Sequence, residues 1–320
     1  MAHTPKMTQV RYYRVNAFTA TPAGGNPAGV VFDADGLTET QMQSVAAALA
    51  MSETAFVTAP TQPGATHRVR FFTPLAEVDL CGHATIATFY QMAATGRVRP
   101  ASDRGEEVTA LAQETKAGLL PVYVHWRDGA PRRVMMVQAK PQIVRAVSDP
   151  AEIARLAEIL GCAPTDLQID GVGPAVVSTG LPDLILPVRS RDVLWTLKSD
   201  NDALTEYSRA TNTISVHAFT LDVEETGQGH TAQCRDFSPL VGIPEESATG
   251  TASGATAAYM VAKRLVPAAG ETVRMVLEQG YSMGKPSQIA VEVDVAGGEP
   301  VAVRVGGQAV AIKEGTLEVL

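Results

Sequence analysis

Apolar and polar residues alternate along this chain in short blocks that predict strands and helices mixed from end to end. In the first third, β-branched and aromatic runs predict strands over 10–18, 28–32, 55–59 and 67–72. Thr38 stands three residues before Gln41, the spacing of a capping box, so we expect a helix from there to about Ala50. At helical spacing, its buried face would carry Met42, Val45, Ala46 and Leu49.

The rest of the chain shows the same mixture. Further helices are predicted over 82–95, 150–160, 203–211 and 250–264. Further strands are predicted over 118–126, 133–139, 175–178, 184–187, 214–221, 272–277, 289–295, 301–305 and 309–313. Interspersed strands and helices of this kind predict an α+β fold.

Two blocks of the sequence resemble each other at a separation of about half the chain. Phe72-Thr73-Pro74-Leu75 leads to Gly82-His83-Ala84-Thr85, and Phe237-Ser238-Pro239-Leu240 leads to Gly250-Thr251-Ala252-Ser253. Each block continues into a helix of small residues that contains a tyrosine. Short motifs can also match by chance, but the paired blocks favour a duplicated fold of two similar halves.

Each repeated block places a glycine at the start of a predicted helix. Helix starts expose unpaired N–H groups and carry a partial positive charge. Two such starts that face each other across a cleft, at Gly82 and Gly250, would bind an anion, most simply a substrate carboxylate. A single glycine of this kind is weak evidence for a site, and two in matched positions are stronger.

Composition and charge narrow the classes of protein that fit. Of the 320 residues, 45% are hydrophobic and 19% are charged, which is ordinary for a globular protein and excludes a disordered chain. The net charge of −8 supplies no basic excess for nucleic acid or for an anionic membrane surface. We therefore expect neither as a partner.

The N-terminus and the cysteines point to the cytoplasm. Residues 1–6 lack the apolar core of a signal peptide, and no run approaches the length of a membrane span. Cys81, Cys162 and Cys234 are odd in number and far apart, which argues against a disulfide framework. No Cys-x-x-Cys motif or histidine cluster indicates a zinc site.

Three side chains are candidates for acid–base chemistry. Glu53 lies among small and apolar residues between a predicted helix and a predicted strand, where a partly desolvated carboxylate suits a general acid or base. His83 follows the first repeated glycine, and Glu246 precedes the second. Structural roles remain open for all three: Glu53 as a turn cap, His83 as a hydrogen-bonded structural residue and Glu246 as a solvated loop residue.

Two further residues are candidates for contact with a ligand. Cys81 immediately precedes Gly82, and a thiol at a helix start has a lowered pKa and can exchange a proton. Its repeat partner is Thr249, so symmetric two-thiol chemistry is not available to this chain. Asn26 stands in a glycine-rich turn, where it either shapes the turn or bonds a polar group of a substrate.

Taken together, these residues resemble the PhzF-type isomerase family, named for phenazine biosynthesis. The segments that carry the resemblance span most of the chain: 16–18, 25–31, 51–57, 70–74, 80–85, 178–182, 248–252 and 280–287. The resemblance implies the duplicated diaminopimelate-epimerase-like fold, with a sheet wrapped around a central helix in each half. It implies halves of 1–130 and 131–305, an active site in the cleft between them, and a last strand, about 306–320, that returns to the first half.

The resemblance also implies a chemistry. Family members move a hydrogen along a small cyclic amino acid, without a metal or an organic cofactor, and are commonly homodimers. The proton-shuttling glutamate of the family maps onto Glu53, with His83 as its hydrogen-bonding or relay partner. The carboxylate-binding walls map onto the backbone at Gly82 and Gly250, with the side chain of Thr251, and Thr249 and Cys81 lie beside them.

The chain departs from the family pattern in its second acid. Glu246 stands where the family has an aspartate, and a serine follows it in place of a proline. Cys81 occupies the place of a catalytic thiol in two-cysteine epimerases, as a residual or as an acting group. The sequence therefore predicts a cofactor-independent isomerase of a small amino or carboxylic acid. An epimerase or racemase using Cys81 and a non-catalytic metabolite-binding protein are the alternatives.

Overall fold

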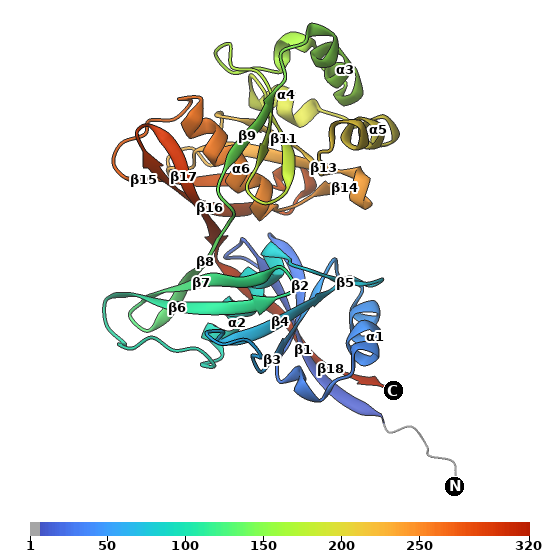
Figure 1. Cartoon of the computed structure of the whole chain (residues 1–320), viewed down its shortest axis with the longest axis vertical. Helices are drawn as coiled ribbons and strands as arrows, with labels where there is room; N and C mark the ends of the chain where they lie inside the picture. Colours follow the sequence, from blue (N-terminus) through green and yellow to red (C-terminus); the bar gives the residue numbers. More distant parts are fainter. Residues whose placement is uncertain (1–6) are drawn as a thin grey trace. The chain divides into compact units, whose positions relative to one another are not determined.

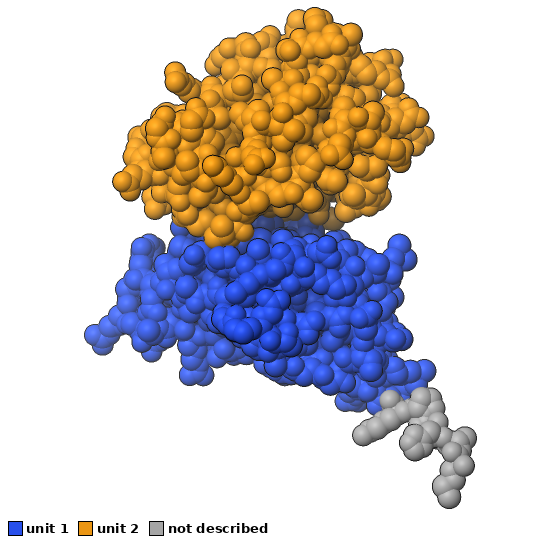
Figure 2. Space-filling model, in the orientation of Figure 1, with its two compact units in different colours: residues 1–136, 306–320 blue, residues 137–305 orange. Residues whose placement is uncertain are grey.

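The chain divides into two compact units, which we describe one at a time. The computed structural model describes residues 7–320, so the N-terminal residues 1–6, where no signal peptide is expected, lie outside it. Unit 1 runs to Met136 and takes in Gly306–Leu320, and unit 2 is Val137–Val305 (Figure 2). Among the described residues, no helix combines the length and the apolar character that crossing a membrane requires.

Unit 1 is a mixed sheet with one enclosed helix (Figure 1). Its strands are β1 (Thr8–Ala17), β2 (Asn26–Val31), β3 (Thr54–Thr58), β4 (His67–Phe72), β5 (Glu77–Val78), β6 (Glu106–Thr115), β7 (Gly118–Arg127), β8 (Ala130–Val137) and β18 (Ala309–Val319). Its helices are α1 (Glu39–Leu49), α2 (Gly82–Ala94) and the 3-10 turn η1 (Ala34–Gly36). The last strand, β18, pairs antiparallel with the first, β1.

Unit 2 is built from a second set of strands. They are β9 (Gln142–Ala146), β10 (Ala175–Ser178), β11 (Pro182–Pro187), β12 (Val216–Thr220), β13 (Ala232–Ser238), β14 (Ile243–Glu246), β15 (Thr272–Gln279), β16 (Ser287–Ala296) and β17 (Glu299–Gly307). The helices are α3 (Pro150–Leu160), α4 (Arg191–Thr196), α5 (Asn201–Thr211) and α6 (Gly250–Ala262). Three 3-10 turns complete the unit: η2 (Pro164–Asp166), η3 (Pro239–Val241) and η4 (Tyr281–Met283).

The two sheets repeat the same order of pairing. In unit 1, β1–β2 is antiparallel, β2–β3 parallel, β3–β4 and β4–β5 antiparallel, β4–β6 parallel and β6–β7 antiparallel. In unit 2, β10–β11, β11–β12, β12–β13, β13–β14, β13–β15 and β15–β16 follow in the same sequence of directions. The duplicated α+β fold predicted from the sequence repeat is thereby confirmed.

A helix of small residues lies at the centre of each unit. Ten of the thirteen residues of α2 are buried, and so are ten of the thirteen of α6. A helix that is apolar on all sides is buried on all sides. α2 contacts β1, β2, β3, β7 and β18, and α6 contacts β10, β11, β12 and β16. At Gly254 of α6, a Cβ atom would lie within 3 Å of the side chains of Gln138 and Val305, so glycine lets these neighbours pack close to the helix.

The peripheral helix of unit 1 begins and ends as its sequence predicts. Both hydrogen bonds of the capping box form between Thr38 and Gln41, and Ala50 adopts the left-handed conformation that ends α1. The predicted inner face packs on a core cluster that includes Val10, Phe56 and Phe72. Met42, Val45 and Ala46 are buried there, and Leu49 is partly buried.

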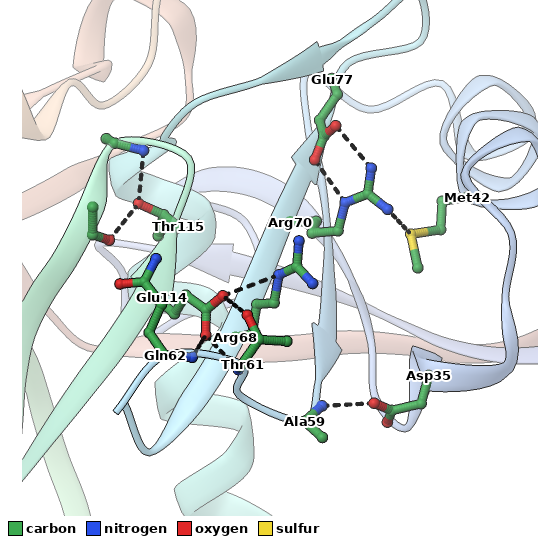
Figure 3. Close-up of polar contacts among 12 residues, drawn as sticks. Asp35, Met42, Ala59, Thr61, Gln62, Arg68, Arg70, Glu77, Glu114 and Thr115 are labelled. Atoms are coloured by element: carbon green, nitrogen blue, oxygen red, sulfur yellow. Dashed lines mark hydrogen bonds and ion pairs between the residues drawn. The ribbon is translucent and has the colours of Figure 1, made fainter. Parts of the chain in front are cut away.

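An ion pair holds β4 to β5 in unit 1, and its counterpart holds β13 to β14 in unit 2. Arg70 forms two hydrogen bonds of 2.7 and 2.8 Å with Glu77, and Figure 3 shows its guanidinium between that carboxylate and Met42. Arg235 forms two of 2.8 Å with Glu245. Each guanidinium also lies over a phenylalanine two residues later, at 5.1 and 4.8 Å.

A buried glutamate fastens a loop in each unit. Glu114, on β6, accepts hydrogen bonds from the backbone N–H groups of Thr61 and Gln62 (Figure 3). Glu278, at the equivalent register on β15, accepts them from the N–H groups of Glu224 and Glu225. These carboxylates tie the loop after β3 and the loop after β12 to their sheets.

The structure also contains elements that the pattern did not predict. The long strand β6, the buried strand β13, the exposed strand β9, the short strands β5 and β14, and helix α4 were all missed. β13 reads Ala-Gln-Cys-Arg-Asp-Phe-Ser, and six of its seven residues are buried although several are polar. Because these polar side chains are buried against partners on neighbouring strands, the sequence of β13 lacks the apolar–polar alternation that predicts a strand.

Candidate active site

Three of the predicted residues come together at the start of α2. Glu53 is the last residue before β3, and its carbonyl oxygen accepts a hydrogen bond of 3.0 Å from the N–H of Gly29 on β2. Cys81 is the N-cap residue of α2, and His83 is the second residue of that helix. The sheet thus carries the carboxylate, and the helix start carries the thiol and the imidazole.

The carboxylate of Glu53 lies against the imidazole of His83. Oε2 of Glu53 is 3.3 Å from Nε2 of His83, and the side chains are 18% and 7% exposed. No residue among 7–320 donates a hydrogen bond to this buried Oε2, so only the histidine ring, when protonated, offers it a charge partner. Ser52 places its Oγ 3.2 Å from the same ring nitrogen. An under-satisfied carboxylate oxygen at this position is available to a proton.

Burial chiefly lowers the pKa of His83, while the charge of Glu53 and the hydrogen bond to the Pro27 backbone act to raise it. The lowered pKa favours the neutral ring near neutral pH. A neutral imidazole has one nitrogen that donates and one that accepts, so it can pass a proton or hold a hydrogen bond. Asn26, the residue before Pro27, is buried at the first position of β2.

The thiol of Cys81 completes this cluster. Its Sγ lies 3.4 Å from Nδ1 of His83, and the residue is 8% exposed. Cys81 makes no side-chain capping bond to α2. The N–H groups at a helix start favour a negative charge. A Cβ at Gly82 would come no nearer than 3.8 Å to a neighbouring atom, the sulfur of Met136, so the backbone here is not closely covered.

The predicted residues of unit 2 lie at the start of α6. Thr249 is the N-cap residue, and its Oγ1 donates a hydrogen bond of 3.1 Å to Oε2 of Glu246 at the end of β14. Gly250 is the first helical residue, and the carbonyl oxygen of Thr251 accepts a bond of 3.2 Å from Thr179. Glu246 is therefore half-buried and hydrogen-bonded rather than a solvated loop residue.

Sequence reasoning missed the residue that fixes this loop. Gln279, wholly buried at the end of β15, donates to the carbonyl oxygen of Glu246 at 2.8 Å and to Oγ1 of Thr249 at 3.1 Å. Its own oxygen accepts from the N–H of Thr249 at 3.1 Å. Its neighbour Gly280 has a positive φ, and a Cβ there would come within 2.6 Å of the carbonyl oxygen of Ser247. Gln279 thus holds in place the loop that leads into α6.

A row of buried polar side chains lies beside that loop, and the sequence did not reveal it either. His217 on β12 faces Asp236 on β13, which in turn faces Glu246. Nδ1 of His217 is 2.8 Å from Oγ1 of Thr256 on α6. Burial lowers the pKa of His217 despite the charge of Asp236. Burial, together with that same charge, holds the pKa of Asp183 well above its usual range.

The structure thus groups the predicted site residues into two sets, one in each unit. Glu53, Cys81, Gly82 and His83 converge in unit 1, with Asn26 on the neighbouring strand β2. Glu246, Thr249, Gly250 and Thr251 are neighbours in unit 2. That these sets form a single site in a cleft between the units stays a prediction.

One group of side chains in the described part of the chain has the make-up of a metal site. The ligand atoms of Glu53, Cys81 and His83 all lie within 4.8 Å of one another. They offer one oxygen, one sulfur and one nitrogen.

Comparison with known proteins places these residues in a wider context. Residues 15–315 match the profile of the family described as "Phenazine biosynthesis-like protein". A Deinococcus radiodurans protein named "Uncharacterized isomerase" is 40% identical over 98% of this chain and 96% of its own length. The trans-2,3-dihydro-3-hydroxyanthranilate isomerase of Pseudomonas aeruginosa is 30% identical over 95% of this chain and 98% of its own length.

The fold has close counterparts among solved structures. The crystal structure of the Bacillus anthracis phenazine biosynthesis protein of the PhzF family matches with a TM-score of 0.82. It is 32% identical and covers 98% of this chain and 100% of its own. This match agrees with the diaminopimelate-epimerase-like fold that the sequence resemblance implied.

Proposed function

The chain belongs to the phenazine biosynthesis-like protein family, and from this premise we propose that it is an isomerase in which Glu53 moves a proton within a small carboxylic acid. Glu53 takes a proton from one carbon of the substrate and returns it to another. The substrate class is a small amino or carboxylic acid with an unsaturated, possibly cyclic, carbon skeleton. Protein side chains carry out the whole reaction, and no cofactor is involved.

The observation that carries the proposal is the environment of the Glu53 carboxylate. Its Oε2 is buried, receives no hydrogen bond from the described residues and lies 3.3 Å from Nε2 of His83. A structural carboxylate at this depth would have its lone pairs occupied. A general base needs a lone pair directed at the proton that it takes, with a partner that responds to the change in charge. His83 is that partner.

Binding and charge stabilisation come from the helix starts. In unit 1, the N–H groups at Gly82 and His83 offer donors to a substrate carboxylate. In unit 2, Gly250 and Thr251 play the same part, with Glu246 as the second acid. Acid–base help is typically worth ~10²–10⁴-fold, so positioning and electrostatics must supply the rest of the acceleration. The enzyme works as a cytoplasmic homodimer.

The test is hydrogen exchange in D₂O, followed by ¹H NMR with a panel of small amino and unsaturated cyclic carboxylic acids. We expect the wild type to incorporate deuterium into one member of the panel and Glu53→Gln to incorporate none. Because glutamine keeps the shape of the side chain, ligand binding should persist. Exchange at the wild-type rate in Glu53→Gln would contradict the proposal, and tight binding with no exchange by the wild type would favour a metabolite-binding protein.

A second candidate function rests on the thiol. Sγ of Cys81 is 3.4 Å from Nδ1 of His83, close enough for this pair to act as an acid–base couple in an epimerase or racemase. An epimerase would exchange the α-hydrogen and shift no double bond. Loss of α-exchange in Cys81→Ser would favour it, and full activity in that variant would assign the reaction to Glu53.

A further inference from the structure

Proton transfer uses Glu53 and His83, but it leaves the convergence of three different metal-binding side chains unexplained. Glu53, Cys81 and His83 supply O, S and N donors from a strand start and a helix start, all within 4.8 Å of one another. Nothing in their sequence spacing indicates such a site, because Glu53 is far along the chain from the Cys81-x-His83 pair. The fold alone brings them together.

The carboxylate and imidazole donors are spaced as they are around a tetrahedral metal ion, and the thiol lies beside them. With bonds of about 2.0–2.3 Å to nitrogen, oxygen and sulfur, ligand atoms around zinc lie roughly 3.3–3.5 Å apart. In the structure, Oε2 of Glu53 is 3.3 Å from Nε2 of His83, and Sγ of Cys81 is 3.9 Å from the same nitrogen. Sγ lies nearer to Nδ1, at 3.4 Å, so a metal held at Nε2 requires the Cys81 side chain to rotate toward that nitrogen.

We propose that Glu53, Cys81 and His83 form a binding site for one Zn²⁺ ion per chain, and that zinc inhibits the isomerase by occupying it. The inhibitory part rests on the proposed function, whereas the binding part does not. Thiolate and imidazole donors select zinc over magnesium or calcium, which prefer oxygen ligands. Three protein ligands leave a fourth position for water or a substrate group.

Occupation of this site is incompatible with proton transfer. On binding, the thiol proton of Cys81 passes to solvent, and the lone pairs of Sγ, Nε2 and Oε2 are donated to the metal. The lone pair of Glu53 that takes the substrate proton is then engaged. The same-register positions in unit 2 are Ser215, Thr249 and Thr251, which make no comparable donor set. We therefore expect one ion per chain and not two.

Cobalt(II) alone serves as the probe, because it replaces zinc and reports a thiolate ligand by a sulfur-to-cobalt charge-transfer band. The full chain is stripped of metal with EDTA under reducing conditions, desalted and titrated. We expect the band to saturate at one Co²⁺ per chain and to disappear when one equivalent of Zn²⁺ is added. Cys81→Ser should lack the band, and Glu53→Gln and His83→Asn should bind Co²⁺ more than about tenfold more weakly.

Cys162→Ser is the matched control, since Cys162 is a half-buried cysteine outside the cluster. It should keep the band and its stoichiometry. If Cys81→Ser does not fold, reversible blocking of the wild-type thiol must abolish the band instead. A wild-type protein with no band, or a band that survives in Cys81→Ser, would overturn the proposal.

The metal experiment and the isomerase experiment fail independently. Exchange that survives in Glu53→Gln overturns the proposed function, and the cobalt titration still decides the site. A missing cobalt band overturns the site, and the dependence of exchange on Glu53 is unaffected. If both hold, one equivalent of Zn²⁺ should reduce exchange by the wild type at least tenfold, and EDTA should restore it.

Discussion

The two units of this protein share a framework and differ where the framework meets the start of the central helix. Both pin a short strand with a bidentate arginine–glutamate pair, and both fasten a loop with a buried glutamate. Before β3 and its counterpart β12, however, Glu53 corresponds to Ser215. At the helix start, His83 corresponds to Thr251. The residues that hold the strands and loops together are thus the same in both units, whereas the residues beside the start of the central helix differ.

The difference extends to the inner face of each sheet. Unit 1 places Ala55 and Phe71 where unit 2 places His217 and Asp236, and all four are buried. Because this face of unit 1 is apolar, the Glu53–His83 pair is a polar contact among apolar neighbours. In unit 2, the polar row supports the loop that carries Glu246. Unit 1 therefore holds its candidate base in apolar surroundings, whereas unit 2 holds Glu246 in a hydrogen-bonded polar loop.

The strongest test of this difference between the units compares substitutions at two equivalent positions, Glu53 and Ser215. Glu53→Gln should lower hydrogen exchange by at least ~10²-fold, because a general base contributes on that order. Ser215→Ala, at the same register in unit 2, should change it by less than about threefold. ¹H NMR in D₂O measures both. Comparable losses in the two variants would contradict the assignment of the general base to Glu53.

The loop-fastening glutamates should differ in their contribution to folding. Glu278 is wholly buried and accepts bonds from two N–H groups, His230 and Gln233, so Glu278→Ala should cost about 3–5 kcal/mol of unfolding free energy. Glu114 serves a more exposed loop, and Glu114→Ala should cost about 1–3 kcal/mol. Urea unfolding measures both changes. A larger cost at Glu114 would reverse the comparison.

Two buried carboxyl groups should affect stability with opposite dependence on pH. The pKa of Asp183 is raised, so the folded state retains a proton that the unfolded state releases, and stability falls as pH rises above about 4. Desolvation raises the pKa of Glu114, but bonds from Thr61 and Gln62 outweigh it and leave the pKa lowered, so its stabilisation is lost in acid.

Asp183→Asn should therefore gain stability relative to the wild type as pH rises from 4 to 8, and Glu114→Gln should lose its deficit below about pH 4.5. Thermal melts across pH 3–8 distinguish the two. If the stability difference from the wild type changed with pH in the same direction in both variants, the pKa of one of these carboxyl groups would not be shifted in the assigned direction.

The smallest expected effect concerns the repeated arginines. Lysine cannot form two parallel bonds to a carboxylate. Arg235 also donates to the carbonyl oxygens of Leu194 and Leu197, whereas Arg70 donates to Glu39 on α1. Arg235→Lys should therefore cost about 2 kcal/mol and Arg70→Lys about 1 kcal/mol of unfolding free energy. Equal costs would show that the backbone contacts of Arg235 contribute nothing.

The sequence was most informative where local chemistry determines structure. The Thr38–Gln41 capping box, the helix starts at Gly82 and Gly250 and the repeat itself could be recognised from a few neighbouring residues. Strand β13 was not predicted, because its polar residues can be buried only where they meet partners on adjacent strands. The isomerase prediction is confirmed by family membership, and the roles of individual residues remain proposals.

The candidate site shows the same limit. His83 was found because it follows a repeated glycine, and Glu53 because it interrupts an apolar stretch. Gln279, His217 and Asp236 were missed because they come from different strands, and only cross-strand register makes them neighbours of Glu246. No spacing along the chain encodes a contact of that kind.

The return of β18 to β1 has a consequence for the order in which the protein is made. Residues 309–319 pair along almost the whole length of β1, yet a ribosome synthesises them after every residue of unit 2. During translation, unit 2 can close while unit 1 still lacks an edge. Unit 1, which bears Glu53, stays incomplete until the final strand emerges, so premature termination before residue 309 should yield a folded unit 2 and an incomplete unit 1.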